Sequence, residues 1–475
     1  MGLDAPAPAV NPVAMTVYRQ IYQRVRASIE DGKLKAGDRL PSARALASEL
    51  GVARGTVDAA YALLSGEGYV VSRGRGGTII SPELPAMAPR PAKASPDPAP
   101  PERPRRAGAR TAFAAGWTLI PGVPSLDLFP RKIWSQLITR QARGLTVIDL
   151  AYPDAGGRRD LRDALAAYLA VARGIHCTAE QILITGGYQS ALGLLLRRLA
   201  TPQSEVWIED PAYPPTRQAV TAIGATPVSV PVDRDGMNVE AAERLSPDGR
   251  LCIVTPAHQY PLGVTLSLPR RLALLDWAKR TGGWIVEDDY DGEFRHQGRA
   301  FPALKSLDRD DRVFYVGTFS KTLFPGLRLG YVVAPAGEAR GLAELLRWLD
   351  GGRPNLEQGV VAAFLSQGHF ARHLKKMRTA YDARRTALAA ALAQAFGDRV
   401  EVDPGAGGLH MVVRTHLGES DVALAARAHA AGLRPLALSP LCHADDHGQA
   451  LLVGFANTPE RHAAGIAQRL RDALA

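Results

Sequence analysis

A proline-rich stretch at residues 82–110 divides this chain of 475 residues and limits how it can fold. The stretch holds nine prolines and six basic residues, with hardly any aliphatic side chain. Proline fixes the backbone and removes a hydrogen-bond donor, and a segment without apolar side chains cannot form a core. We therefore expect an extended linker here. It would join two separately folded parts, residues 12–81 and residues 111–475.

Residues 12–81 carry the pattern of a small helical domain that ends in a hairpin. Apolar residues recur every four positions at the start, which predicts an amphipathic helix over residues 16–32. A second helix is expected to begin at Ser42, its N-cap, and a third to cover residues 52–65. Two short β-branched runs then flank the basic, glycine-rich segment 73–77, which predicts a two-stranded hairpin. Three helices and a hairpin make a winged helix-turn-helix.

Residues 111–475 alternate short apolar runs with helical patterns, which predicts an α/β domain. The runs are almost continuously apolar, as expected for strands of a mainly parallel sheet with helices on both faces. The expected strands are 182–185, 206–208, 251–254, 284–286, 313–316 and 331–333. Residues from about 370 onward predict a smaller α+β subdomain. The chain as a whole is therefore expected to be a multidomain protein, with a mainly α winged domain followed by an α/β body.

A lysine among small hydroxyl residues is the strongest chemical signal in the sequence. Residues 317–328 read Gly-Thr-Phe-Ser-Lys-Thr-Leu-Phe-Pro-Gly-Leu-Arg, with the lysine at position 321. About thirty residues upstream, another expected strand ends in Glu-Asp-Asp-Tyr at residues 287–290. Pyridoxal phosphate requires an amine for a Schiff base, a carboxylate for its pyridine nitrogen, and cations with hydroxyls for its phosphate. The sequence therefore predicts a site for pyridoxal 5'-phosphate.

A glycine pair closes the first expected strand and opens a helix, in the sequence Thr-Gly-Gly-Tyr-Gln at residues 185–189. Free backbone N–H groups and the helix dipole favour a phosphate at such a helix start. We expect Gly187, Tyr188 and Gln189 to bind the phosphate there, together with Thr318 and Arg328 from the lysine motif.

Charge and cysteine usage narrow the classes of partner. Residues 1–110 carry a net +6 of the formal +10, which hints at a polyanion partner, although a solvated basic surface is the commoner explanation. The three cysteines are scattered, so neither a disulfide framework nor a metal site is expected. No basic region followed by an apolar run opens the chain, and no stretch approaches the length of a membrane span, so we expect a cytoplasmic protein.

The segments 40–47, 50–57 and 60–69 together resemble the amino-terminal domain of GntR-type transcriptional regulators. The DNA-binding residues that this resemblance implies are Ser42, Arg44, Arg54, Gly55, Thr56, Arg73 and Arg75. Arg54 and Thr56 would meet base edges at the start of the third helix, while the other basic residues would neutralise phosphates. Ala53 and Gly55 stand where the family often has hydroxyl residues, which leaves the number of contacts open. A helical oligomerisation domain with incidental arginines is the alternative interpretation.

The body resembles fold-type I aminotransferases, and with its linker and winged domain the chain looks like the MocR/GabR subgroup of GntR regulators. The cofactor-binding residues that this implies are Lys321, Asp288, Tyr290, Gly187, Tyr188, Gln189, Tyr213, Thr318, Arg328 and Tyr152. Lys321 would form the internal aldimine. Asp288 would pair with the pyridinium nitrogen, with Asp289 as its rival. Tyr290 would donate to the phenolate oxygen of the cofactor.

Two aromatic assignments follow from the same resemblance. Tyr213 would stack on the cofactor ring, unless it is a turn residue packed into the core. Tyr152 resembles the tyrosine that reaches the phosphate from a neighbouring subunit, so a homodimer is expected.

Two departures from true aminotransferases bear on catalysis. Tyr260 occupies the position of the family's usual asparagine, and Leu452 the position of the arginine that binds a substrate carboxylate. Without that arginine the site lacks a cation that could bind an α-carboxylate through two charge-assisted hydrogen bonds. Other arginines that could serve as an anchor are Arg217, Arg414 and Arg434. His258 and His410 are expected to be structural rather than catalytic.

The sequence is compatible with three functions. The leading hypothesis is a dimeric regulator that binds operator DNA and senses pyridoxal phosphate, or an amine or amino-acid effector, through an aldimine. The alternative is a working aminotransferase with an accessory DNA-binding head. A third is a DNA-binding protein whose aminotransferase-like body is only a dimerisation scaffold.

Overall fold

The computed structural model describes residues 17–84, 118–295 and 302–475. The chain divides into two compact units, residues 1–105 and 106–475, and each is described by itself. The predicted linker at 82–110 lies, from residue 85 onward, outside the described residues, as do the start of the predicted first domain and residues 111–117 of the second. Among the described residues, no helix is long and apolar enough to cross a membrane.

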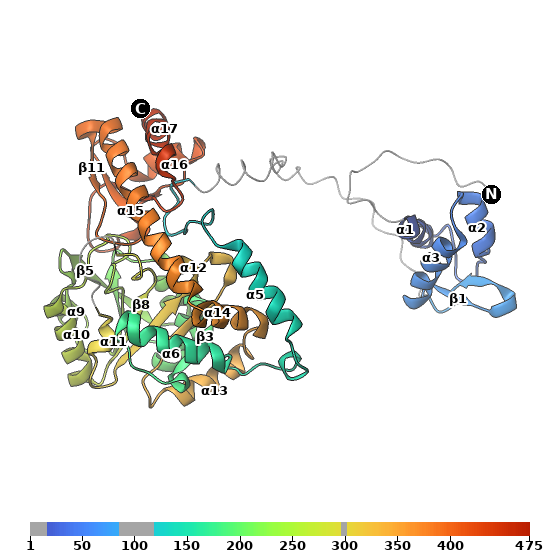
Figure 1. The fold of residues 1–475 in the computed structure, drawn as a ribbon, viewed down its shortest axis with the longest axis horizontal. Helices are drawn as coiled ribbons and strands as arrows, with labels where there is room; N and C mark the ends of the chain where they lie inside the picture. Colours follow the sequence, from blue (N-terminus) through green and yellow to red (C-terminus); the bar gives the residue numbers. More distant parts are fainter. Residues whose placement is uncertain (1–16, 85–117, 296–301) are drawn as a thin grey trace. The chain divides into compact units, whose positions relative to one another are not determined.

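The amino-terminal unit consists of three helices followed by a two-stranded hairpin (Figure 1). Its elements are α1 (Val17–Glu30), α2 (Ala43–Leu50), α3 (Arg54–Gly66), β1 (Val70–Ser72) and β2 (Thr78–Ile80). The Ser42 side chain accepts a hydrogen bond from the backbone of Ala45 and so caps α2, which ends at Gly51 in the left-handed conformation. β1 and β2 pair antiparallel around a single turn of 3₁₀ helix at Gly74–Gly76. These elements confirm the predicted winged helix-turn-helix.

One apolar core holds the amino-terminal unit together. All three helices and both strands contribute to it, and Val57, Ala60 and Leu64 of α3 are completely buried. Tyr61 of α3 also lies in this core, where its hydroxyl donates to the carbonyl of Pro41 at 2.9 Å. The apolar side of α3 therefore faces the core, and its first turn remains at the surface.

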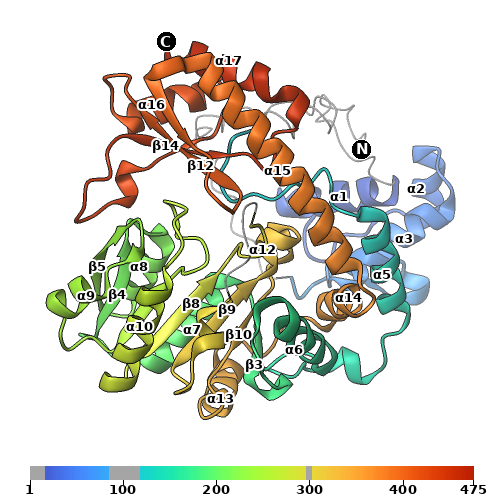
Figure 2. The same ribbon diagram turned by 60° about the vertical axis from the view of Figure 1, so that its left-hand side comes forward.

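The second unit is built on an eight-stranded sheet in the order β3-β10-β9-β8-β7-β4-β5-β6 (Figure 2). The strands are β3 (Ile182–Thr185), β4 (Glu205–Asp210), β5 (Thr226–Asp233), β6 (Gly236–Met237), β7 (Leu251–Val254), β8 (Trp284–Asp289), β9 (Val313–Thr318) and β10 (Gly330–Val333). β4, β5, β7, β8 and β9 are parallel to one another, whereas β10 runs antiparallel to both β3 and β9. The predicted mainly parallel sheet is thus confirmed, with β10 reversed.

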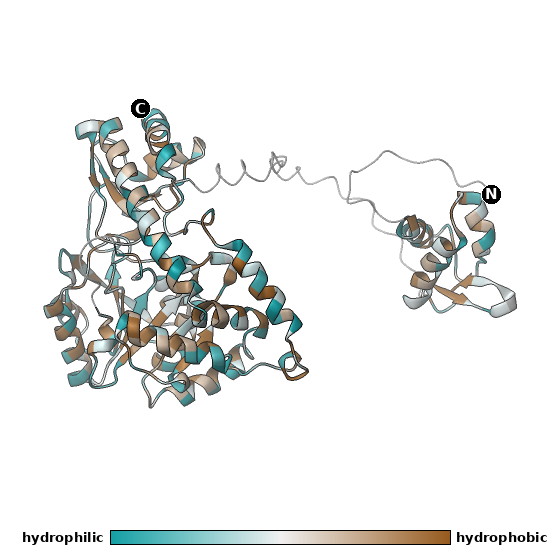
Figure 3. Ribbon diagram, viewed as in Figure 1, coloured by the Kyte–Doolittle hydropathy of each residue, from teal (hydrophilic) through white to brown (hydrophobic). Residues whose placement is uncertain are grey.

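Helices cover both faces of this sheet. Those that surround it are α5 (Arg131–Arg143), α6 (Arg159–Arg173), α7 (Tyr188–Leu199), α8 (Pro214–Ala222), α9 (Val239–Leu245), α10 (Leu268–Thr281), α11 (Leu304–Leu307), α13 (Ala339–Leu349) and α14 (Asn355–Ser366). Alternate strand residues point to opposite faces, so α7, α8 and α13 share one core with the sheet, while α9, α10 and α11 share another with its opposite face. α5, α6 and α14 also pack on that opposite face. Figure 3 shows that these helices carry both hydrophobic and hydrophilic residues, as expected for helices with one side against the sheet and the other toward solvent.

A smaller subdomain follows, and it confirms the α+β prediction for the carboxy-terminal part. It contains α15 (His369–Phe396), β11 (Val400–Asp403), β12 (His410–Thr415), α16 (Asp421–Ala430), β13 (Leu436–Ala437), β14 (Ala450–Gly454) and α17 (Ala463–Leu474). Its four strands pair antiparallel in the order β11-β12-β14-β13. The helices and sheet share a continuous core with α5, α6 and α14 of the large subdomain.

Candidate functional site

The predicted site segments meet at one edge of the large sheet. Parallel strands direct their carboxyl ends to the same edge, so β8 delivers residues 288–290 beside the end of β9. β10 runs the other way, and its first residue, Gly330, pairs with Thr185 of β3 on one side and Thr318 of β9 on the other. Its reversed direction brings the preceding Arg328 to this same edge.

Lys321 lies on the short helix α12 (Phe319–Thr322), directly after β9. Thr318 caps this helix by accepting a hydrogen bond from the backbone of Ser320 at 3.1 Å. The Lys321 Nζ donates to the carbonyl of Gly122 at 2.7 Å. Burial lowers the pKa of this amine, an effect that the nearby carboxylates of Asp291 and Asp288 oppose. A lowered pKa increases the fraction of neutral, nucleophilic amine.

Asp288 and Asp289 have different surroundings, although they are adjacent in the sequence. Asp289 is buried in an ion pair with Arg173 and accepts a hydrogen bond from the Tyr315 hydroxyl at 2.7 Å. The buried Asp288 carboxylate makes neither a hydrogen bond nor an ion pair with any residue that the structure describes. Burial, followed by the charges of Asp289 and Asp291, raises the pKa of Asp288 well above its usual range. A buried, unpaired carboxylate fits a cationic ring nitrogen, so the geometry favours Asp288 over its rival.

A glycine-rich turn opens α7 beside Arg328. Gly187 has a φ of 94° and precedes the first turn of α7, where the backbone N–H groups of Tyr188 and Gln189 have no partner within the helix. A Cβ atom on Gly187 would lie 3.8 Å from the Arg328 guanidinium, so the cation borders this turn. Helix start, cation and the adjacent Thr318 together suit the phosphate of the predicted cofactor.

Arg353 is a residue of this region that the sequence did not indicate. A Cβ atom on Gly186 would lie 2.8 Å from Arg353 Nη2, so the guanidinium lies directly against the glycine turn. Arg353 contacts Asp350, while its Nε is buried without a hydrogen-bond partner in the part of the chain that the structure describes. It stands in the loop before α14, where no motif or strand end marks it. Only the three-dimensional structure brings it to the candidate phosphate site.

Four tyrosines from separate segments line up near this edge. The ring of Tyr213 lies 6.1 Å from that of Tyr188 and 5.6 Å from that of Tyr260, between ring centroids. The Tyr260 ring is in turn 6.2 Å from that of Tyr290. Tyr213 is 41% exposed, so it is not packed into a core. By contrast, Tyr152 is 99% exposed and is not brought to the other residues within this chain.

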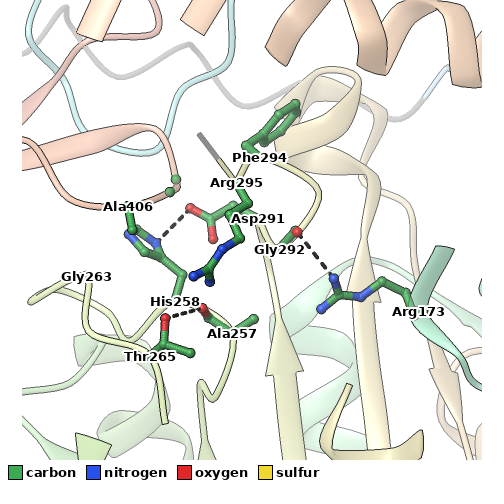
Figure 4. A pocket seen from close by; sticks show the side chains of 12 residues that line it. Arg173, Ala257, His258, Gly263, Thr265, Asp291, Gly292, Phe294, Arg295 and Ala406 are labelled. Carbon is green, nitrogen blue, oxygen red and sulfur yellow. Dashed lines mark hydrogen bonds and ion pairs between the residues drawn. The ribbon is translucent and has the colours of Figure 1, made fainter. Parts of the chain in front are cut away.

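Tyr290 also contacts a buried histidine. Its hydroxyl lies 2.9 Å from Nδ1 of His258. This same nitrogen is 3.2 Å from a carboxylate oxygen of Asp291 (Figure 4). Burial raises the pKa of the Tyr290 hydroxyl well above its usual range, which keeps it protonated and able to donate.

The position of the family's substrate-binding arginine is apolar in this chain, and two of the three alternative arginines already make hydrogen bonds. Leu452 is completely buried on β14, in a cluster with Val412 and Leu438 against which Tyr260 packs. Two of the alternative arginines are hydrogen-bonded: Arg217 Nη2 to the Ser229 hydroxyl at 2.5 Å and Arg414 Nη1 to the carbonyl of His447 at 2.7 Å. Arg434 is half-buried.

Most of the candidate DNA-binding residues whose burial the structure describes are exposed on the amino-terminal unit. Arg54 is the first residue of α3 and is 71% exposed, with Asp58 3.4 Å away. Gly55 is exposed and Thr56 is half-buried in the same turn, and Arg44 is exposed on α2. Arg73 is exposed in the hairpin, and Arg75 lies in the 3₁₀ turn at its tip. The Ser42 hydroxyl is already engaged as the cap of α2.

Comparisons with known proteins match both units. Residues 17–80 match the family described as "Bacterial regulatory proteins, gntR family", and residues 130–433 match "Aminotransferase class I and II". The chain is 36% identical to the probable rhizopine catabolism regulatory protein MocR of Rhizobium meliloti, over 93% of this chain and 90% of that protein. It is 32% identical to the pyridoxine biosynthesis transcriptional regulator PdxR of Corynebacterium glutamicum, over 98% of each.

Solved structures resemble the second unit. That of LysN, an α-aminoadipate aminotransferase of Thermus thermophilus complexed with N-(5'-phosphopyridoxyl)-L-leucine, covers 77% of this chain and 93% of its own. The TM-score is 0.69 and the sequences are 27% identical.

Proposed function

We propose that this chain responds to a small ligand. It belongs to the MocR/GabR type of GntR-family transcriptional regulators, and its fold-type I aminotransferase-like body takes pyridoxal phosphate as its cofactor. In this proposal the winged unit binds operator DNA, and the body senses pyridoxal phosphate itself or a small amine or amino acid. The protein would act in the cytoplasm, where its DNA is found. The observation that carries the proposal is that Lys321, directly after β9, and Asp288, at the end of β8, share one sheet edge. The Asp288 carboxylate is buried there and has no hydrogen-bond or ion-pair partner among the described residues.

Pyridoxal phosphate, when bound, supplies an aldehyde that reacts with a primary amine. Lys321 would present its amine to that aldehyde, and its lowered pKa favours the neutral form. Asp288 would pair with the ring nitrogen, and Tyr290 would donate to the phenolic oxygen. The proposed residues for holding the phosphate are Gly187, Tyr188, Gln189, Thr318 and Arg328. Tyr213 would stack against the ring.

Sensing is favoured over efficient transamination by the apolar surroundings of Leu452. An aminotransferase needs a cation for the carboxylate of its amino-acid substrate, but Leu452 packs among Val412, Leu438 and Tyr260. A charged side chain at this buried position would also lack a partner. The body is therefore better suited to recognising an amine than to repeated turnover.

A second copy of the chain is proposed to complete the site. Residues 147–152 carry an apolar surface in which Val147, Ile148 and Leu150 are each more than 70% exposed, next to the fully exposed Tyr152. A contiguous apolar surface of this kind is typical of an interface. In the resulting homodimer, Tyr152 would reach the phosphate site of the second copy.

The proposal is tested by loading the full-length protein with pyridoxal phosphate. We expect a visible absorption band and, after borohydride reduction, a covalent modification at Lys321. The Lys321→Ala variant should lose both, while its affinity for random-sequence DNA at low salt changes less than about twofold, because the substitution lies in the other compact unit. A wild-type protein without band or modification would contradict the proposal. Loss of all DNA binding in Lys321→Ala would contradict the separation of the two roles.

A further inference from the structure

A buried carboxylate, Asp291, faces a buried imidazole, His258 (Figure 4), and the imidazole contacts Tyr290. Asp291 is 1% exposed and His258 is 5% exposed, so both are removed from water. One nitrogen of the imidazole, Nδ1, lies 2.9 Å from the Tyr290 hydroxyl oxygen and 3.2 Å from Oδ2 of Asp291. Both neighbours of this nitrogen can therefore influence where its proton lies.

The contact with Asp291 decides the proton position on His258. An unprotonated Nδ1 would direct its lone pair toward a carboxylate oxygen at 3.2 Å, and the lone pair and the negative charge of the carboxylate would repel each other. A protonated Nδ1 is instead stabilised by the carboxylate. The hydrogen-bond geometry is satisfied toward the tyrosine rather than the carboxylate, since neither oxygen of Asp291 makes a hydrogen bond among the described residues. Nδ1–H therefore donates to the oxygen of Tyr290.

This direction of donation determines what the tyrosine can do. A hydroxyl whose oxygen already accepts a hydrogen bond keeps its own hydrogen for another acceptor. Each donation also strengthens the next one along a chain of hydrogen bonds. Tyr290 is thereby prepared to donate to an anionic oxygen, whereas the opposite tautomer of His258 would consume its hydrogen.

The surrounding backbone fixes the imidazole in place. Gly408 has a φ of 75°, and a Cβ atom there would lie 2.1 Å from Cε1 of His258 and 2.8 Å from Oδ2 of Asp291. On the other side, a Cβ atom on Gly263 would lie 3.2 Å from Nε2. The ring is thus held between two glycines that approach it closely. A side chain at Gly408 would clash with the ring, and one at Gly263 would crowd it at a φ of 77° that disfavours residues other than glycine.

His410 supplies no charge that competes at the imidazole. Burial lowers the pKa of His410 to about 4, so this ring is neutral, and its Nε2 donates to the carbonyl of Pro261. Its centroid is 5.6 Å from that of His258. Among the remaining neighbours, Arg173 and Arg295 are cationic, and both border a cavity of about 20 Å³ that His258 also lines. Arg173 is paired with the buried carboxylate of Asp289. The cavity has room for about one water molecule, which would donate to His258 Nε2, a nitrogen without a hydrogen-bond partner among the described residues.

We infer that His258 and Asp291 are positioning residues that fix the hydrogen of Tyr290 in the direction of the cofactor's phenolic oxygen. The inference rests on the proposed function, since it takes Tyr290 to face the cofactor. It assigns a role to a histidine for which the sequence predicted only a structural one. Asp291 acts on His258, and His258 acts on Tyr290; neither is required to touch the cofactor.

The experiment follows the pH midpoint of the visible band in full-length protein loaded with pyridoxal phosphate. Donation by Tyr290 stabilises the anionic oxygen of the cofactor, so weaker donation raises the pH at which that form appears. We expect His258→Leu to raise the midpoint by about one unit, as for loss of a hydrogen bond to a charged group. Asp291→Asn should shift it less but in the same direction, and Tyr290→Phe at least as much.

A double substitution separates positioning from a general structural effect. If His258 acts through the tyrosine, adding His258→Leu to Tyr290→Phe leaves the midpoint of the single Tyr290→Phe variant unchanged. His258→Asn, which retains an N–H near the place of Nδ1, should recover part of the wild-type midpoint. The control is His429→Gln, because His429 makes a comparable Nε2 contact with the carbonyl of Pro435, and we expect no shift.

The outcomes separate this inference from the proposed function. A wild-type protein with no visible band contradicts the proposed function itself. A normal band whose midpoint moves in Tyr290→Phe but not in His258→Leu overturns the role of His258. If His258→Leu fails to fold, the nearly isosteric Asp291→Asn decides, and an unchanged midpoint overturns the inference.

Discussion

Arg54→Ala tests whether the start of α3 reads DNA sequence. Arg54 is 71% exposed, and its only ion pair among the described residues is with Asp58, which is itself 51% exposed. An exposed pair one helical turn apart contributes less than about 0.5 kcal/mol. The substitution should therefore leave the amino-terminal unit folded, and any large change in DNA binding reports on the contact itself.

The size of that change follows from the position of Arg54 at the amino end of the helix. An arginine that binds a guanine through two hydrogen bonds contributes about 1–3 kcal/mol of discrimination. Its loss should weaken binding to the operator by about 5- to 150-fold relative to random DNA. The operator is first selected by the wild-type protein from a random library. Fluorescence anisotropy then gives Kd for both DNAs at several salt concentrations.

Arg73→Ala provides the matched control. Arg73 is an exposed arginine of the hairpin, and we expect it to bind a phosphate. Its substitution should weaken binding to operator and to random DNA equally, and reduce the slope of log Kd against log salt by about 0.9. Equal losses on operator and random DNA for Arg54→Ala would refute its role as a base reader.

Two further predictions concern the body. Burial raises the pKa of Glu209 to about 7, so the stability that its neutral form provides is complete below about pH 4.5 and is lost as the pH rises through 7. Glu209→Gln should remove this loss, so the variant should be about 3 kcal/mol more stable than the wild type at pH 8 and about equally stable at pH 4. A difference in the free energy of urea unfolding that is the same at both pH values would contradict this expectation. Gly157→Ala should destabilise the body by about 3 kcal/mol, because the new Cβ would lie 2.2 Å from Ile184 Cγ1 at a φ of 97°. Gly337→Ala, with open space around it, is the control, and equal unfolding midpoints for the two would refute the argument.

Most of the fold was predictable because its elements carry strong local patterns. The caps Ser42 and Gly51 marked the ends of α2, and continuous apolar runs marked the central strands. β5 was not predicted, because Pro227 and Pro231 interrupt its apolar pattern. The structure tolerates them because β5 lies next to the short edge strand β6, which pairs with only its last residues. The antiparallel direction of β10 could not be predicted from the sequence either, since strand direction depends on the topology of the whole sheet.

The candidate site was predictable where a motif follows a strand. Lys321, Asp288 and Gly187 stand at such positions, and their roles in cofactor binding stay predictions. Residues that reach the site by tertiary packing gave no signal. Arg353 arrives from a loop before a helix, and the contact between His258 and Asp291 joins two separate segments of the chain. Pairings of this kind depend on how two loops approach each other, which local periodicity does not encode.

The reversed strand has a consequence for how the protein matures. Thr185 and Gly330 are far apart in the chain, yet they pair in adjacent strands at the edge where the phosphate is expected. Contacts between such distant segments form slowly, because a large loop must close first. We therefore expect the phosphate site to form only late in folding. Binding of pyridoxal phosphate would then report that the central sheet has been assembled correctly.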